Sequence, residues 1–150
     1  ALALGDLEVR SSPAWSPDSR SLLFAARRLG RAQLYQQALE GGSPRLLASC
    51  AADIRAPHFS PDGRWVAFLC GYELFRMPWP ATGEVPPVRV ALGTWRALEV
   101  FPGLDGIVAV GFDASRSLVN LSTGAVSRLA PGPPLADPAS LASFRSGVFW

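Results

Sequence analysis

Three side chains that could form a catalytic triad stand close together in the sequence: His58, Ser60 and Asp62. A serine nucleophile needs a histidine base that is oriented by a carboxylate, and His58 is the only histidine in the chain. However, His58 lies between Pro57 and Phe59 in a segment with the composition of a strand, and Ser60 and Asp62 belong to the turn that follows. We therefore expect His58 to be a half-exposed strand residue without a catalytic role.

Sequence motifs typical of metal binding, nucleophilic catalysis and nucleotide binding are also missing. One histidine and two separated cysteines do not make a set of zinc ligands. There is no G-x-S-x-G motif, no P-loop and no dinucleotide-binding glycine pattern. The carboxylates Asp18, Asp62 and Asp105 recur at a regular interval, which marks them as turn residues and not as an acid–base pair. We predict no catalytic residue, no metal site and no cofactor in this chain.

The turn around Asp62 has a clear physical basis. Pro61 presets the backbone angle of a type I turn, Asp62 can accept hydrogen bonds from nearby backbone N–H groups, and Gly63 can take the left-handed conformation. Strand-forming residues flank this turn on both sides, so the segment predicts a β-hairpin. The corresponding structural turn residues of an earlier and a later copy are Pro17, Asp18, Asp105 and Gly106.

These hairpins recur along the whole chain. Each unit contains four short strands, and a period of about 40 residues with four strands per unit is typical of a β-propeller blade. We predict an all-β fold, a partial β-propeller of four-stranded antiparallel blades that forms a single domain over residues 1–150. The expected blades are residues 7–48, 50–92 and 93–130, with a truncated copy at 131–150. A β-sandwich is the alternative, and the matching offsets of the repeats disfavour it.

About three and a half blades cannot close a ring, and an open propeller leaves sheet edges exposed. We therefore expect the chain to be a piece of a larger protein, or to complete its ring with another chain.

Within the first blade, we expect strands near residues 12–15, 22–26, 33–39 and 45–49. Antiparallel order places the turns between second and third strands (B–C turns) and the links between blades on one face. This face should carry the candidate partner-contacting residues Arg27, Arg28, Arg31, Asp53, Tyr72 and Asp113. The competing interpretation is that these loops are simply solvated.

Composition limits the classes of partner. The formal net charge is +2, which is too small to indicate nucleic acid or an anionic membrane as a partner. No apolar run is long enough to span a membrane, and no signal peptide is visible at the start, although one already removed would leave no trace. Cys50 and Cys70 should fall on the same rim, so a disulfide is conceivable, but we expect two reduced, small apolar side chains.

The repeated Pro-x-aromatic-Ser-Pro-Asp-Gly pattern, followed by Leu-Tyr, Gly-Gly and Arg-Leu pairs, resembles the PD40 or TolB-like propeller repeat. The later part of the chain looks most like the N-terminal propeller of S9 (prolyl oligopeptidase family) serine peptidases, in the acylaminoacyl- and dipeptidyl-peptidase branch. In that family, the propeller covers an α/β-hydrolase domain that holds the catalytic residues, and it filters substrates by size. No catalytic residue can therefore be assigned to this chain.

The resemblance implies a non-catalytic propeller segment that gates peptide access and docks on an α/β-hydrolase domain, or on the remaining blades of the same protein. The partners would then include the peptide substrates of the parent enzyme. The alternative is a TolB-like propeller that acts as a protein–protein interaction scaffold. We expect a cytoplasmic location, with a periplasmic one as the alternative.

Overall fold

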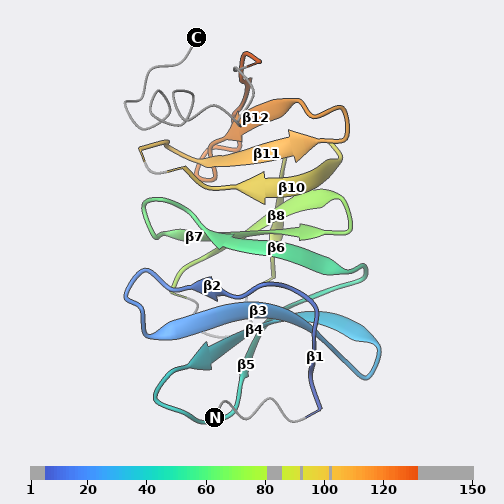
Figure 1. Ribbon diagram of the computed structural model, residues 1–150, viewed down its shortest axis with the longest axis vertical. Helices are drawn as coiled ribbons and strands as arrows, with labels where there is room; N and C mark the ends of the chain where they lie inside the picture. Colours follow the sequence, from blue (N-terminus) through green and yellow to red (C-terminus); the bar gives the residue numbers. More distant parts are fainter. Residues whose placement is uncertain (1–5, 81–85, 92, 102, 132–150) are drawn as a thin grey trace.

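The computed structural model describes residues 6–80, 86–91, 93–101 and 103–131, and within these ranges the chain forms strands and turns without helices. Three antiparallel sheets lie one above another along the long axis (Figure 1). This is the arrangement of successive blades in a β-propeller, which confirms the predicted fold class. The expected fourth copy, residues 131–150, lies outside the described residues except for Pro131.

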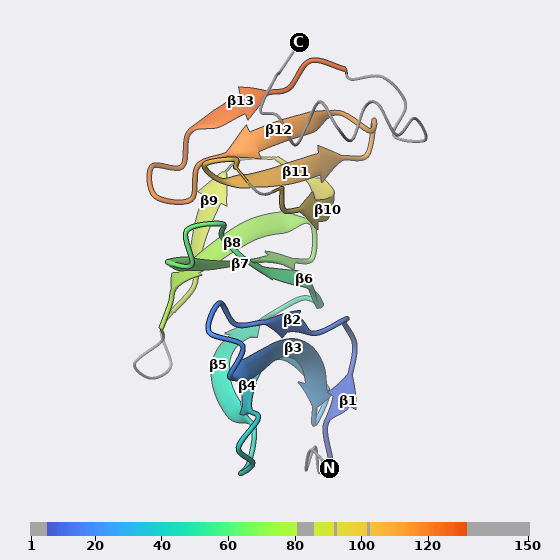
Figure 2. The same ribbon diagram turned by 60° about the vertical axis from the view of Figure 1, so that its left-hand side comes forward.

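The first sheet contains β1 (Glu8–Val9), β2 (Ala14–Trp15), β3 (Ser21–Arg28), β4 (Arg31–Ala38) and β5 (Arg45–Cys50). The second contains β6 (Ile54–Phe59), β7 (Trp65–Cys70), β8 (Glu73–Pro78) and β9 (Val88–Ala91). The third contains β10 (Trp95–Glu99), β11 (Ile107–Gly111), β12 (Arg116–Val119) and β13 (Val126–Arg128). The first strands run along one edge of the stack and the last strands along the other (Figure 2).

The central sheet is apolar on both faces. In β7, Val66 and Phe68 pack into a core shared with the first sheet, whereas Ala67 and Leu69 pack into a core shared with the third. All four side chains are fully buried. A strand that is covered on both sides carries a continuous apolar run instead of alternating polar and apolar residues, and the sequence of β7 has this pattern.

The β2–β3 turn of the first sheet and the β6–β7 turn of the second sheet are closed by the same kind of side-chain hydrogen bonds. In the second sheet, the buried Ser60 hydroxyl donates to Asp62 and accepts from the Trp65 backbone N–H at 3.1 Å. Ser16 and Asp18 repeat this arrangement, with Ser21 N–H donating to Ser16 Oγ at 2.9 Å. The serine hydroxyl holds the pKa of the Asp62 carboxyl below its ordinary value. Asp18 and Asp62 both lie in turns of the structure, and each carboxylate accepts the hydroxyl hydrogen bond of its serine.

The third copy of the turn is built differently. Asp105 accepts a hydrogen bond from Asn120 Nδ2 at 3.1 Å, so its partner lies on the neighbouring turn and not within its own. Gly106 has a φ of +142°, and a Cβ at this position would lie 2.3 Å from the Val119 carbonyl oxygen. Gly106 is therefore required by close packing against the following strand pair.

Three expected strand boundaries differ from the structure. The first strand is split into β1 and β2, and only β2 overlaps the expected segment at residues 12–15. In the third sheet, the repeat pattern predicts a strand at Val100–Phe101 just before the turn, but the first strand β10 ends at Glu99. In the first sheet, Arg27, Arg28 and Arg31 were expected in a B–C loop, but they lie at the ends of β3 and β4, because these long strands leave only a two-residue turn.

We predict that Ser60→Ala lowers the free energy of unfolding by about 1–2 kcal/mol, because the substitution leaves the Trp65 N–H without its acceptor. Chemical denaturation of the two proteins measures the difference. Ser43→Ala, at an exposed serine in a connecting segment, is the matched control and should change stability little. Equal effects of both substitutions would show that the Ser60 hydroxyl does not stabilise the turn.

Candidate functional site

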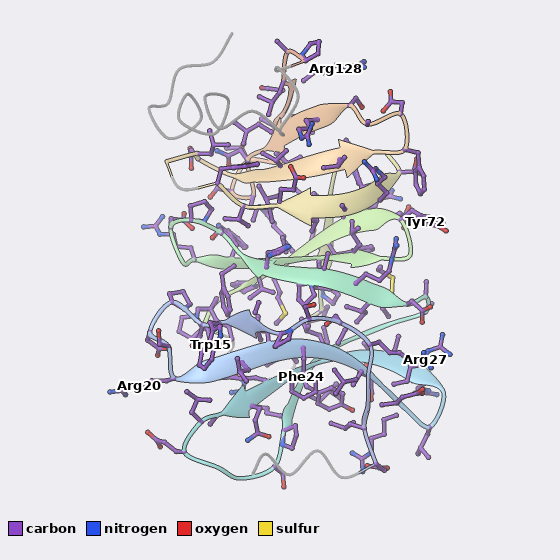
Figure 3. The ribbon with its side chains drawn as sticks, in the orientation of Figure 1. Trp15, Arg20, Phe24, Arg27, Tyr72 and Arg128 are labelled. Carbon is purple, nitrogen blue, oxygen red and sulfur yellow. A yellow bond between two sulfur atoms is a disulfide. The ribbon has the colours of Figure 1, made fainter. Side chains whose placement is uncertain are left out.

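The structure brings the candidate residues to one side of the stack. The β3–β4, β7–β8 and β11–β12 turns and the link into β6 all lie on this side, which we call the B–C face (Figure 1). Arg27 and Tyr72 lie there, whereas Arg20 lies on the opposite side (Figure 3). Side chains on the B–C face also form contacts between adjacent sheets, such as the ion pair of Arg27 with Asp53 and the ring contact of Tyr72 with Phe112.

Arg27 connects the first sheet to the second. Its guanidinium donates to Asp53 Oδ1 through Nε, at 3.1 Å, and through Nη2. This ion pair lowers the pKa of Asp53 and raises that of Arg27, chiefly through the direct hydrogen bond. Arg28 makes a similar contact with Asp6, at 3.3 Å. Two of the predicted partner-contacting cations are thus paired within the chain.

Arg31 differs from these two arginines because it is exposed and forms no ion pair with any described residue. It lines a hollow of about 620 Å³ at the junction of the first and second sheets. The other walls come from Arg27, the β5 end and the link into β6. Asp53 in its wall is paired with Arg27, so Arg31 leaves the hollow with an unmatched positive charge that suits a negatively charged group better than an apolar one.

Tyr72 is held in place although half of it is exposed. The Arg55 guanidinium stacks over its ring at 5.0 Å, and the ring of Phe112 meets it edge-on at 5.1 Å. Its backbone oxygen accepts a hydrogen bond from Trp95 N–H at 2.8 Å. Arg55 also donates to the Gly71 oxygen at 2.6 Å. The second and third sheets therefore share a rigid cluster of arginine and aromatic groups.

Asp113 has a structural role in its own turn. It accepts hydrogen bonds from the Ser115 hydroxyl and from the Ser115 N–H, the latter at 3.0 Å, and these bonds lower its pKa. Arg128 approaches its other oxygen at 3.7 Å. Like Asp18 and Asp62, Asp113 accepts from the N–H two residues later, but its serine partner follows it in the sequence instead of preceding it. Asp113 therefore contributes mainly to the shape of the face.

Cys50 and Cys70 are joined by a disulfide, so the expectation of two reduced thiols is wrong. Cys50 ends β5 and Cys70 ends β7, and packing of the two sheets brings their Cα atoms to 6.1 Å. The low number of cysteines favoured the reduced form, but it carries no information about this proximity. The disulfide joins the first and second sheets beside the hollow that Arg31 lines.

Sequence reasoning missed three residues of the B–C face: Leu29, Arg55 and Phe112. Leu29 is 92% exposed at the tip of the β3–β4 turn, and Phe112 is 61% exposed at the start of the β11–β12 turn. Large apolar residues inside short polar turns are the signal that could have identified Leu29 and Phe112. Arg55 gave no such signal, because it lies within a strand and reaches the face through its long side chain.

The opposite face carries the β2–β3, β6–β7 and β10–β11 turns, which contain Asp18, Asp62 and Asp105. A second hollow of about 300 Å³ is lined by Pro61, Asp62, Asp105 and Gly106, among others. His58 lies in β6, where its imidazole hydrogen-bonds to the Leu98 main chain in the next sheet. The described residues contain no group of three or more His, Cys, Asp or Glu side chains that could hold a metal ion. They also contain no helix that is long and apolar enough to cross a membrane.

Comparisons with known proteins agree with the fold. No family model matches the chain. An alignment over 58 positions, which covers 37% of this chain, is 47% identical to an uncharacterized peptidase, YuxL, of Bacillus subtilis, but it spans only 9% of that protein. TolB from Acinetobacter baumannii superposes with a TM-score of 0.62 at 23% identity, covering 83% of this chain and 33% of TolB.

Prolyl oligopeptidase B from Galerina marginata also superposes, with a TM-score of 0.59 at 10% identity. This match covers 83% of the present chain and 21% of the peptidase. The chain thus has the fold of TolB-like and prolyl oligopeptidase propellers, and it spans less than half of each protein that it matches.

We predict that Cys50→Ser/Cys70→Ser lowers the free energy of unfolding by about 3 kcal/mol, the loop-closure value for a cross-link of this span. The two cysteines are 20 residues apart in the sequence. Urea unfolding of oxidised and reduced wild-type protein and of the double variant measures the effect. Reduction should affect only the wild type. Alkylation of both cysteines in unreduced, denatured protein would contradict the disulfide.

We predict that acidification destabilises the protein through His58. Burial lowers the pKa of His58 below its ordinary value, and the hydrogen bond to Leu98 offsets this only in part. Because the unfolded chain then binds the proton first, stability falls as the pH drops through about 6.5, and it stops falling below the folded pKa. Urea unfolding over a pH series should show this slope, and His58→Gln should flatten it. An unchanged slope in the variant would exclude His58 as its source.

Proposed function

We propose that the chain is a non-catalytic propeller segment of a serine peptidase of the prolyl oligopeptidase type. The observation that carries this proposal is the 47% identity over 58 residues to the Bacillus subtilis protein that is named as a peptidase. The structural likeness to prolyl oligopeptidase B supports the same class through the fold. The catalytic groups would then lie on an α/β-hydrolase domain.

In this proposal, the propeller restricts the entry of peptides and docks on the hydrolase domain or on further blades of the same protein. The apolar cluster of Phe24, Ala26 and Tyr35 lies on the face of the first sheet opposite the shared core, as would be expected of a blade that packs on both sides. The peptide substrates of the parent enzyme would meet the propeller before they reach the catalytic groups.

The disulfide bears on the location of the protein. Disulfides persist in oxidising compartments and are rare in the reducing cytosol. The Cys50–Cys70 link therefore favours the periplasmic alternative over the cytoplasmic location that we expected from the sequence.

The second candidate function is a TolB-like scaffold that binds proteins and has no enzymatic domain. The similarity to TolB of Acinetobacter baumannii favours it, because this match covers 83% of the chain at 23% identity, whereas the match to prolyl oligopeptidase B covers the same share at 10% identity.

We predict that the protein isolated from its natural source has a mass several times that of this 16.0 kDa chain and reacts covalently with a fluorophosphonate probe. The reason is that such probes label an activated serine, which the hydrolase domain would supply. Intact mass spectrometry with and without the probe measures both properties, and heat-denatured protein is the control. A mass near that of a single closed propeller, without labelling, would refute the peptidase and support the scaffold.

A further inference from the structure

The B–C face exposes a large apolar side chain on the turn of each of three successive sheets. Leu29 is 92% exposed, Tyr72 is 53% exposed and Phe112 is 61% exposed. Scattered apolar residues on a surface are ordinary, but these three occupy corresponding turns on one face. The turns at the opposite ends of β3 and β7 are built instead from Ser, Pro and Asp.

The apolar groups of this face are positioned before any partner arrives. Arg55 and Phe112 fix the ring of Tyr72 from two directions, and its backbone oxygen is bonded to the third sheet. A preorganised aromatic group loses little conformational entropy on binding. Aromatic and arginine side chains of this kind also contribute most of the binding energy in many protein interfaces. The pair of Tyr72 and Phe112 thus has the properties of a binding anchor.

The charges of the face indicate the sign of its partner. Arg27 and Arg28 are paired with Asp53 and Asp6, whereas Arg31 and Arg55 form no ion pair with a described residue. Arg31 lines the hollow next to the Leu29 turn, and Arg55 lies against Tyr72. Leu29 and Tyr72 therefore each have an unpaired cation nearby, an arrangement that complements carboxylates placed between apolar side chains. The Asp113 carboxylate beside Phe112 is already bonded to Ser115.

We propose that the B–C face binds an extended, acidic polypeptide segment that carries apolar side chains between its carboxylates. Neighbouring sheets pack about 10 Å apart, and three residues of an extended polyproline II segment advance about 9 Å. Apolar residues at every third position would therefore meet Leu29 and then the Tyr72–Phe112 pair, with carboxylates toward Arg31 and Arg55. The proposal does not depend on a peptidase identity, because a scaffold would use the same face.

The test uses the protein with its disulfide intact and a fluorescein-labelled peptide of three Leu-Glu-Pro repeats. We expect saturable binding by fluorescence anisotropy that weakens as salt is added. Arg31→Glu should weaken it by about tenfold, because this substitution places a carboxylate in the hollow. Leu29→Ser and Phe112→Ser should each weaken it by about fivefold to tenfold through loss of apolar contact. Peptides with Lys in place of Glu, or Ser in place of Leu, should bind more weakly.

Matched controls lie on the opposite face: Arg20→Glu repeats the charge reversal, and Leu39→Ser repeats the loss of an exposed leucine. Both should bind the acidic peptide within about twofold of wild type, since electrostatic effects of remote exposed charges are screened. Circular dichroism of every variant verifies folding. Equal affinity for acidic and basic peptides, equal effects of substitutions on the two faces, or no saturable binding would overturn the proposal. Fluorophosphonate labelling is unaffected by these outcomes, so the two proposals fail separately.

Discussion

Burial of both faces of the central sheet is the constraint on which the rest of this structure depends. The second sheet cannot shield Phe68 without the first sheet or Leu69 without the third, so no single sheet forms a stable unit. The disulfide between Cys50 and Cys70 and the ion pair between Arg27 and Asp53 fasten sheets that apolar packing has already brought together. Because strand order is the same in each sheet, this stacking also aligns the turns on each face.

The fold could be predicted because the residues that determine it lie close together in the sequence and recur at a regular interval. Pro61, Asp62 and the apolar run of β7 define a hairpin without reference to distant residues, and the same pattern at Pro17 and Asp18 fixes the period. The strand boundaries of the third sheet are harder to predict. Its first turn lacks the serine–aspartate pair, and Asp105 bonds instead to Asn120 in a different turn. A contact between separate turns leaves no periodic signature in the sequence.

The B–C face was predicted only in part, for a related reason. The order of strands was enough to gather Arg27, Arg31, Asp53 and Tyr72 on one side. Which of the arginines would be paired within the chain depends on how neighbouring sheets approach, and so does the proximity of Cys50 and Cys70. These are properties of packing between sheets, and the sequence of one repeat does not encode them. Leu29 and Phe112 became informative only when their exposure was known.

The serine–aspartate turns lie at the end of β3 and β7 that is remote from Leu29 and Tyr72. The residues that direct local folding are thus separated by the length of a strand from the residues that a partner would meet. Changes at an exposed tip residue such as Leu29 alter the surface while the hairpin closures at Asp18 and Asp62 and the apolar cores keep their contacts. Such a division allows recognition to diverge between related chains under little constraint from folding, and it makes the β3–β4 turn, with the exposed Leu29 at its tip, a suitable position for grafting new binding sequences.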